Sequence, residues 1–425
     1  MMNVQDLHLE KEILPLLDFT YNDFSREVII SMLKEPLHSI DDILFRQEIL
    51  KGFVTNHKII KGYSYYRTDM VESFGFIENF TNNHTTTSAL KFQLLFSVKQ
   101  RHLKRAKLIQ WVLLFHKIHT FYITRLSVKT FPGNYRTEVQ NLNDFLSGFN
   151  LTKYELLIRE HGLKVKHIIQ LTELILQKAG NGEFARFWKQ FFLFEAYISI
   201  SIGITRMDFT FPTFSETNFS LHQFYHPRLA NPVKNSFATN SNVILLTGPN
   251  MSGKSTLLKA ISLCVYLGHI GFAVPANKAE LSFFKTISVA INLNDDMLNG
   301  YSHFMTEVIN LKKVITQAIT RKKCFAVFDE LFRGTNMEDA VEISITTLKG
   351  LTKFKNSLFL ISTHLHQLKE IEEVKTNKIA TFYIDCELKN NSPKFTFMLK
   401  NGWSDLKVGR LLFENEGLNQ MLHNL

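Results

Sequence analysis

One stretch near the middle of the chain restricts the possible folds more than any other. An apolar run at residues 243–246 leads into Gly248-x-x-x-x-Gly253-Lys254-Ser255, and a helical pattern opens at Ser255. The two glycines allow a tight turn whose backbone N–H groups point at phosphate oxygens, and the helix that follows adds its positive dipole end. Strand, glycine-rich turn and helix together predict a phosphate-binding P-loop.

The residue types of this loop indicate which ligands it takes. We expect Lys254 to reach the β and γ phosphates of a nucleotide, and the Ser255 hydroxyl to hold a magnesium ion. ATP and Mg²⁺ are therefore the expected cofactors. The other residues expected to surround the nucleotide are Gly248, Pro249, Asn250, Met251, Ser252, Gly253 and Thr256.

Two later apolar runs also end in polar residues. Residues 324–328 are five apolar residues followed by Asp329 and Glu330, and residues 357–361 lead into Ser362-Thr363-His364. In P-loop enzymes the first such carboxylate lies near magnesium and the second near the attacking water. Three apolar strands that each end in polar groups predict an open parallel α/β sheet with a ligand crevice at one edge.

Length and composition limit the class of protein. A chain of 425 residues suggests two or three domains, and 45% hydrophobic with 21% charged residues excludes a disordered or fibrous protein. The N-terminus lacks a secretory signal, and no apolar run reaches the length of a membrane span. Cys264, Cys324 and Cys386 are widely spaced in apolar sequence, which fits reduced thiols. We expect a cytoplasmic protein without a membrane partner.

The net charge of +10 is distributed unevenly along the chain. Residues 1–50 carry 4 Lys and Arg against 10 Asp and Glu, whereas residues 51–150 carry 14 against 5. A basic segment beside an acidic one suggests a surface that faces a polyanion, most simply nucleic acid. A solvated helical face explains the same pattern equally well. The strongest candidates for phosphate contacts are Lys99, Arg101, Lys104 and Arg105.

The periodicity of apolar residues separates the chain into two parts. Helical spacing dominates residues 7–54 and 88–203, and residues 209–214 then read as extended because Pro212 excludes a helix. Residues 215–242 are rich in turn residues and lead into the P-loop strand. This pattern predicts a helical domain over residues 1–214 and a nucleotide-binding domain over residues 215–425.

Several motifs resemble one known family. Gly248-Pro-Asn-Met-Ser-Gly-Lys-Ser-Thr256 is similar to the P-loop of the MutS DNA mismatch repair proteins, which usually have glycine where Ser252 stands. Other segments that agree in order are Asp295-Asp-x-x-x-Gly300-x-Ser302-x-Phe-Met-x-Glu307, Asp329-Glu-x-x-Arg-Gly-Thr335, Ser362-Thr-His364 and residues 404–412. Upstream segments that resemble the helical core of the family are Met32-Leu-x-x-Pro36-Leu37, Arg46-Gln47 and residues 195–214.

The resemblance implies an ABC-type P-loop ATPase domain preceded by an all-α core and lever domain, acting as a homodimer. It implies that Lys254 clamps the phosphates, that Ser255 and Asp329 hold magnesium, and that Glu330 polarises the attacking water. Asn250 and His364 are expected to sense the γ-phosphate. Ser302 is expected to enter the active site of the partner subunit.

The chain also departs from the family pattern. We expect this chain to lack the mismatch-reading and connector domains, which precede the core in the family, and residues 58–183 are short for full levers with a DNA clamp. No nuclease module is expected after Leu425. His303 stands where the family prefers threonine, and its role stays open.

Two functions of different class follow from these observations. One is an ATP-dependent DNA-binding protein that recognises duplex or structured DNA in mismatch repair or recombination, with other repair proteins as further partners. The other is an ATP-gated binder of RNA, of the ribosome or of a protein. A metabolic P-loop kinase is disfavoured because Asp329-Glu330 and the Ser302 segment suit hydrolysis across a dimer.

Overall fold

The computed structural model describes residues 3–82, 94–291, 303–332, 334–389, 392–406 and 408–423. Backbone contacts divide the chain into two compact units. The sheet unit contains Met1–Ile13, Pro36–Leu44 and Met207–Leu425, and the helical unit contains Leu14–Glu35 and Phe45–Arg206. The expected order, a helical N-terminal region followed by a sheet-containing region, is confirmed. The two functional domains expected over residues 1–214 and 215–425 stay a prediction.

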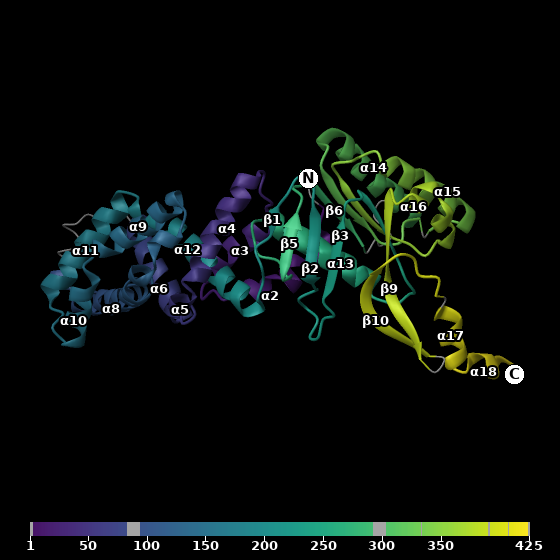
Figure 1. Cartoon of the computed structure of the whole chain (residues 1–425). Helices are drawn as coiled ribbons and strands as arrows, with labels where there is room; N and C mark the ends of the chain where they lie inside the picture. The colour runs from purple at the N-terminus through teal and green to yellow at the C-terminus, as the bar shows by residue number, and fades with distance from the viewer. Residues whose placement is uncertain are drawn as a thin grey trace. The chain divides into compact units, whose positions relative to one another are not determined.

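The helical unit is organised around one central helix, α12 (Glu183–Met207), because apolar residues occur on all sides of α12. Sixteen of its residues are buried. Aromatic rings from neighbouring helices pack on it, as in the pair Phe115 and Trp188, whose ring centroids lie 5.7 Å apart. The surrounding helices are α2 (Leu14–Leu17), α3 (Asp23–Lys34), α4 (Ile40–Thr55), α5 (His57–Ile60), α6 (Arg67–Asn82), α8 (Val98–Phe121), η2 (Ile123–Arg125), η3 (Val128–Thr130), α9 (Gly133–Ser147), α10 (Leu151–Arg159) and α11 (Val165–Gly180) (Figure 1).

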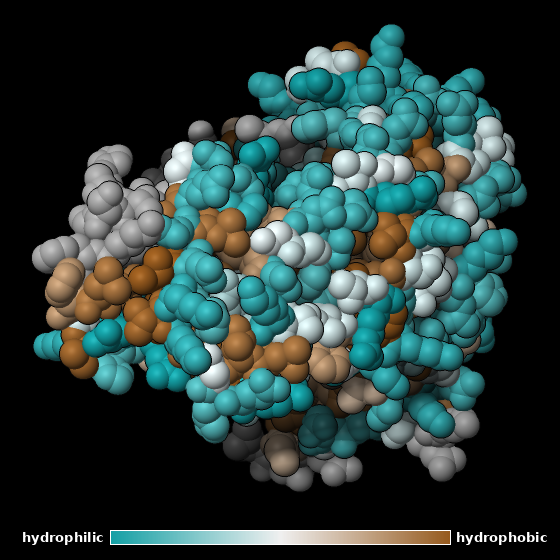
Figure 2. Space-filling model, turned by 90° about the vertical axis from the view of Figure 1, so that its left-hand side faces the viewer, coloured by the Kyte–Doolittle hydropathy of each residue, from teal (hydrophilic) through white to brown (hydrophobic). Residues whose placement is uncertain are grey.

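The surface of this unit has mixed polarity. Figure 2 shows hydrophobic groups in brown between hydrophilic groups in teal, on the face that carries α8, α10 and α11. Among the residues that the structure describes, none of the helices combines the length and the apolar character needed to cross a bilayer.

A six-stranded sheet dominates the other unit (Figure 1). Its strands, in spatial order, are β10 (Ser392–Asn401), β9 (Ile379–Lys389), β4 (Val243–Thr247), β8 (Leu358–Ser362), β7 (Cys324–Phe328) and β6 (Thr286–Ala290). All adjacent pairs are parallel except β10 with β9. Every residue of β4, β7 and β8 is buried, as expected for parallel strands covered on both faces.

Helices on the sheet complete this unit. Apolar side chains of α14 (His303–Arg321) and α15 (Met337–Leu351) form one core with alternate residues of β4, β7 and β8. The helix that follows β4 is α13 (Lys254–His269), and it contacts β8. A smaller sheet has the order β1 (Thr213–Phe214), β5 (Lys278–Leu281), β2 (Phe219–Phe224) and β3 (Asn235–Thr239). The remaining elements are η1 (Gln5–Leu7), α1 (Leu9–Glu12), η4 (His366–Glu370), α16 (Glu372–Lys375), α17 (Val408–Asn415) and α18 (Leu418–His423).

The first residues of the chain extend the large sheet at β6. Asn3 pairs with Ser288 in a parallel bridge, in which the Asn3 amide donates to the Ile287 carbonyl at 2.9 Å. The Asp6 carboxylate accepts a hydrogen bond of 2.7 Å from the Ile291 amide. The N-terminal segment therefore lies along β6, an arrangement that the sequence analysis did not predict.

Candidate active site

The turn between β4 and α13 has a conformation that requires glycine at two positions. Gly248 has a φ of 139° and Gly253 a φ of 95°, both in the range that side chains disfavour. A Cβ on Gly248 would lie 3.1 Å from the buried Ser252 hydroxyl oxygen. We call residues 248–253 the glycine loop. It ends where α13 begins, so that the first N–H groups of α13 lie beside it.

Lys254 folds back over the glycine loop and is only 5% exposed. Its Nζ donates to the carbonyl oxygens of Gly248 at 3.0 Å and Pro249 at 3.3 Å. The same ammonium lies 3.5 Å from the Glu330 carboxylate and 3.5 Å from the Asn250 side-chain oxygen. A buried charge requires partners of this kind, and the loop carbonyls and Glu330 provide them.

Hydrogen bonds to Asp329, which follows β7, connect it with the residues that follow β4 and with the end of β8. The Ser255 hydroxyl donates to Asp329 Oδ2 at 2.5 Å, and the Ser362 hydroxyl donates to Asp329 Oδ1. The Glu330 amide in turn donates to the Ser362 hydroxyl at 2.9 Å. Because β4, β7 and β8 are parallel neighbours, their carboxyl ends bring these residues to one edge of the sheet, as the sequence predicted.

The donor set at this edge fits magnesium. Ser255 and Asp329 present a hydroxyl and a carboxylate oxygen to each other, and both are oxygen ligands of the kind that Mg²⁺ takes. The described part of the chain contains no group of three or more His, Cys, Asp and Glu side chains that could hold an ion by themselves. Magnesium usually keeps waters and substrate phosphates among its ligands, so two protein ligands are sufficient.

The turn after β7 is strained and is held from α14. Glu330 and Phe332 have positive φ values of 55° and 64°, which are uncommon for residues with a side chain and often mark functional sites. The buried Glu307 carboxylate accepts a hydrogen bond of 2.7 Å from the Phe332 amide. Sequence reasoning quoted Glu307 as part of a motif but assigned it no role. Its contact explains why a carboxylate is needed there.

His364 follows β8 and is exposed. It lines a hollow of about 210 Å³ together with Gly248, Pro249, Asn250 and Met251 of the glycine loop. The structure therefore places His364 beside the loop, with its side chain accessible to a ligand. Ser302 lies outside the described residues, as do Asp295 and Gly300, and the side chain of His303 is also not described.

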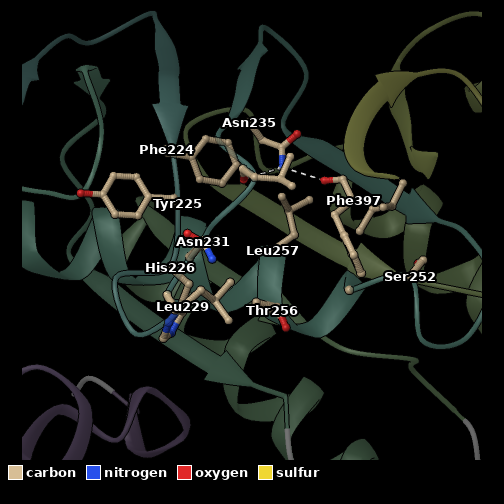
Figure 3. Close-up of a pocket in the computed structure, with 15 residues that line it drawn as sticks. Phe224, Tyr225, His226, Leu229, Asn231, Asn235, Ser252, Thr256, Leu257 and Phe397 are labelled. Carbon is tan, nitrogen blue, oxygen red and sulfur yellow. Dashed lines mark hydrogen bonds between the residues drawn. The ribbon is translucent and has the colours of Figure 1, made fainter. Parts of the chain in front are cut away.

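A second hollow, of about 300 Å³, lies on the other flank of the glycine loop (Figure 3). Its walls are mainly apolar and come from β2, the segment after it, β3, the glycine loop, α13, β9 and β10. The residues that line it are Phe224, Tyr225, His226, Leu229, Ala230, Asn231, Val233, Asn235, Ser252, Gly253, Thr256, Leu257, Ala260, Ile384 and Phe397. Sequence reasoning had left the residues that contact the base unassigned, and among these wall residues it had singled out as site residues only Ser252, Gly253 and Thr256 of the P-loop motif.

Asn235 positions Phe397 at the mouth of this hollow. The pairing of β10 with β9 shifts register between Phe395 and Leu399, and Phe397 has a φ of 58°. The buried Asn235 side chain donates to the Phe397 carbonyl at 3.0 Å and accepts from the Leu399 amide at 2.7 Å. These bonds hold the bulge, and the Phe397 ring lies over Gly253, where an added Cβ would come within 3.4 Å of the ring.

His226 connects the base of the hollow to the N-terminal segment. Its Nε2 lies 3.5 Å from the Glu12 carboxylate, and burial lowers the pKa of His226 although Glu12 opposes this effect. His226 therefore presents a mainly neutral imidazole to the hollow at neutral pH.

Comparison with known proteins agrees with this geometry. The sequence model of the family described as MutS domain V matches residues 244–418. The DNA mismatch repair protein MutS of Bacillus subtilis (strain 168) is 31% identical over 209 residues, which cover 47% of this chain and 24% of that protein. MutS protein homolog 4 of Mus musculus is 31% identical over 227 residues, covering 51% of this chain and 23% of that protein. The chain therefore matches about a quarter of the length of these relatives.

Proposed function

We propose that this chain, which is a member of the MutS family, binds ATP with Mg²⁺ and hydrolyses it to ADP and phosphate. One observation carries the proposal: Lys254 and Ser255 at the start of α13 meet Asp329 and Glu330, which follow β7, at one point beside the glycine loop. Residues 215–425, which carry these side chains, are proposed as an ABC-type P-loop ATPase domain. A phosphate chain placed along the loop would lie within reach of all four side chains.

Hydrolysis requires positioning and charge neutralisation more than covalent chemistry. Ser255 and Asp329 would hold magnesium, which would supply positive charge to neutralise the phosphates. Lys254 would exchange its bonds to the loop carbonyls for bonds to phosphate oxygens. Glu330, no longer occupied with Lys254, would then orient the attacking water. Asn250 and His364 would contact the γ-phosphate from the exposed side of the glycine loop.

The hollow of Figure 3 is proposed to hold the adenosine part of ATP. Its position beside Gly253 and Thr256 continues the line of the phosphates beyond the start of α13. Its apolar walls suit a planar base, and the half-exposed Phe397 ring at its mouth can stack on that base. Asn235 would act as the positioning residue, because it holds the bulge that carries Phe397.

Replacing Phe397 by Ala is expected to weaken ATP binding about fivefold to tenfold and to leave the maximal hydrolysis rate almost unchanged, because stacking holds the base and not the reacting phosphate. The measurement is the KM for ATP beside kcat. Met398→Ala, at an equally exposed neighbour on β10, is the matched control. Inorganic tripolyphosphate has no base, so its inhibition constant should stay the same. A larger inhibition constant for tripolyphosphate in the Phe397 variant would contradict the assignment.

ATP binding is proposed to control binding of duplex or structured DNA, as the name of the bacterial relatives suggests. The basic segment at residues 51–150 supports a polyanion partner. RNA, the ribosome or a protein remains the alternative partner, since the family model matches only residues 244–418 and the Bacillus subtilis relative is matched over only 24% of its length. Salt-dependent retention on DNA compared with RNA separates these proposals.

The four basic residues near the start of α8 are not equivalent. At 100° per residue, Arg101, Lys104 and Arg105 share one side of the helix, whereas Lys99 lies about 160° away. Arg101, Lys104 and Arg105 are half-buried, and burial lowers the pKa of Lys104. Lys107, on the next turn, pairs with Glu72 at 2.9 Å. The single polar face predicted from the sequence is therefore divided in the structure.

Changing Lys99, Arg101, Lys104 and Arg105 to Glu is expected to weaken DNA binding alike for all sequences, with each lost phosphate contact reducing the salt slope by about one unit. The measurement is affinity for two unrelated duplexes over a salt series. Circular dichroism should show that α8 persists, since acidic residues are tolerated in its first turn, which holds Lys99 and Arg101, and glutamate is a good helix former at Lys104 and Arg105. An unchanged slope would assign these residues to a solvated face.

A further inference from the structure

A separate hollow of about 340 Å³ lies in the helical unit, lined by residues of α5, of the turn after it, of the end of α8 and of η2. Three cations line it, Lys58, Lys117 and Arg125. The ring of Phe121 and the side chain of Ile59 form its apolar wall. Neither the ATPase mechanism nor the basic residues near the start of α8 account for this combination.

Local structure holds the cations on three connected elements, α5, α8 and η2. Lys117 and Phe121 are four residues apart on α8 and therefore lie on the same side of this helix. Arg125 follows in η2, with its guanidinium 5.1 Å from the centre of the Phe121 ring. The buried Tyr122 donates from its hydroxyl to the Gly62 carbonyl at 2.6 Å, which ties the end of α8 to the turn after α5.

The positive charge of this hollow is not compensated nearby. Within the part of the chain that the structure describes, Lys58, Lys117 and Arg125 form no ion pair with a carboxylate. The three residues come from two stretches, residues 49–68 and 79–137, that contain no Asp or Glu at all. Three cations around one concave site raise the local concentration of anions.

Cations near the end of a helix can also serve to stabilise the helix dipole. The last carbonyls of α8 already have partners: the Thr124 hydroxyl donates to Thr120 O at 3.1 Å, and the Tyr122 amide donates to Ile118 O at 3.2 Å. Lys117 is a full turn before the end of α8, and helical side chains lean toward the N-terminus. Helix stabilisation therefore explains Arg125 in η2 and Lys58 in the single turn of α5 at most, and it leaves Lys117 without a role.

We propose that this hollow binds a single-stranded nucleic-acid segment, with its phosphates on the three cations and an unpaired base stacked against Phe121 and Arg125. The Phe121 side chain is 47% exposed, although an aromatic ring of this size is usually buried. Aromatic rings interleaved with cations are the usual means of binding single strands, because each base offers a flat face. In duplex DNA the bases stack on one another, so only the phosphates could use this site.

The test compares two variants of the full chain that lose the same charge. Lys58→Gln, Lys117→Gln and Arg125→Gln are combined in the first variant, and the exposed residues Lys153, Lys166 and Arg186 are changed to Gln in the control. Binding of an end-labelled single strand of about 20 nucleotides, long enough to span one site, is measured by fluorescence anisotropy over a salt series. The first variant should bind at least about tenfold more weakly, with a salt slope smaller by about two units. The control should change the slope by less than about half a unit.

A further variant, Phe121→Leu, tests the stacking. It should weaken binding of the single strand about fivefold and leave binding of the matching duplex unchanged. Equal losses in the two charge variants would overturn the proposal in favour of diffuse attraction. Lower thermal stability without weaker binding would assign the cations to the helix end, and loss of binding only to phosphatidylserine vesicles would assign them to a lipid surface. ATP hydrolysis measured without nucleic acid should be unchanged in all of these variants. A failure of the proposed ATPase activity can therefore be distinguished from a failure of the proposed nucleic-acid site.

Discussion

Glu330→Gln is expected to slow ATP hydrolysis about a hundredfold or more and to leave ATP binding nearly intact. Gln keeps the size of the side chain and loses the negative charge that would draw a proton from the attacking water. The measurement is single-turnover hydrolysis beside the dissociation constant for ATP. Glu338→Gln, at an exposed carboxylate in the first turn of α15, is the matched control.

The structure also offers a purely structural role for Glu330, and the same variant separates the two roles. The Glu330 carboxylate lies 3.5 Å from Lys254 and partly balances this buried ammonium. If balance were its only role, Gln would disturb Lys254 and weaken ATP binding, while hydrolysis of bound ATP would continue at the ordinary rate. A normal single-turnover rate in a preparation free of the parent protein would therefore refute the catalytic assignment.

The convergence of the proposed catalytic residues was predictable because it depends on short-range patterns. Buried parallel strands read as continuous apolar runs, and the polar residues that follow each run must lie at the same edge of the sheet. The turn at Gly248 and Gly253 was predictable as well, because glycine is the residue that adopts positive φ values most easily, and both residues have them in the structure. The assignment of magnesium binding to Asp329 and of water activation to Glu330 remains a proposal.

What the sequence could not predict depends on contacts between distant residues. The hydrogen bonds of Asn235 with Phe397 and Leu399 join residues more than 160 positions apart in the sequence. Neither Asn235 nor Phe397 belongs to a periodic pattern. The pairing of Asn3 with Ser288 is similar, because an isolated bridge leaves no alternation to read. The base pocket therefore became visible only in the fold, although its phosphate side was evident in the sequence.

Lys254→Ala is expected to abolish measurable hydrolysis, with a loss of about a hundredfold or more, because the alanine leaves the β and γ phosphates without their ammonium. Lys259→Ala, on the same helix, is the control with the same chemical change. The variant should also lose affinity for ATP, which distinguishes it from Glu330→Gln. A Lys254→Ala protein with ordinary turnover would show that the ammonium only fills the glycine loop.

The same variant tests whether two subunits build each active site. The glycine loop is open on the side of Asn250 and Met251, which are both exposed, and the resemblance to MutS proteins implies that Ser302 of a second subunit completes it. Ser302→Ala should then be inactive as well. In a mixed dimer, however, the subunit that keeps Lys254 receives an intact Ser302 from its partner. Equal mixing should therefore restore about a quarter of the wild-type activity, since half of the dimers hold one complete site of two.

A second mixture provides the matched control, because Lys254 and Glu330 lie 3.5 Å apart in one subunit. Mixing Lys254→Ala with Glu330→Gln leaves every site with one defect, and no activity should return. Recovery in the first mixture alone would support a composite site, and its dependence on protein concentration should follow subunit exchange. Equal recovery in both mixtures, or none in the first where exchange of labelled subunits is demonstrated, would mean that Ser302 acts within its own subunit or not at all.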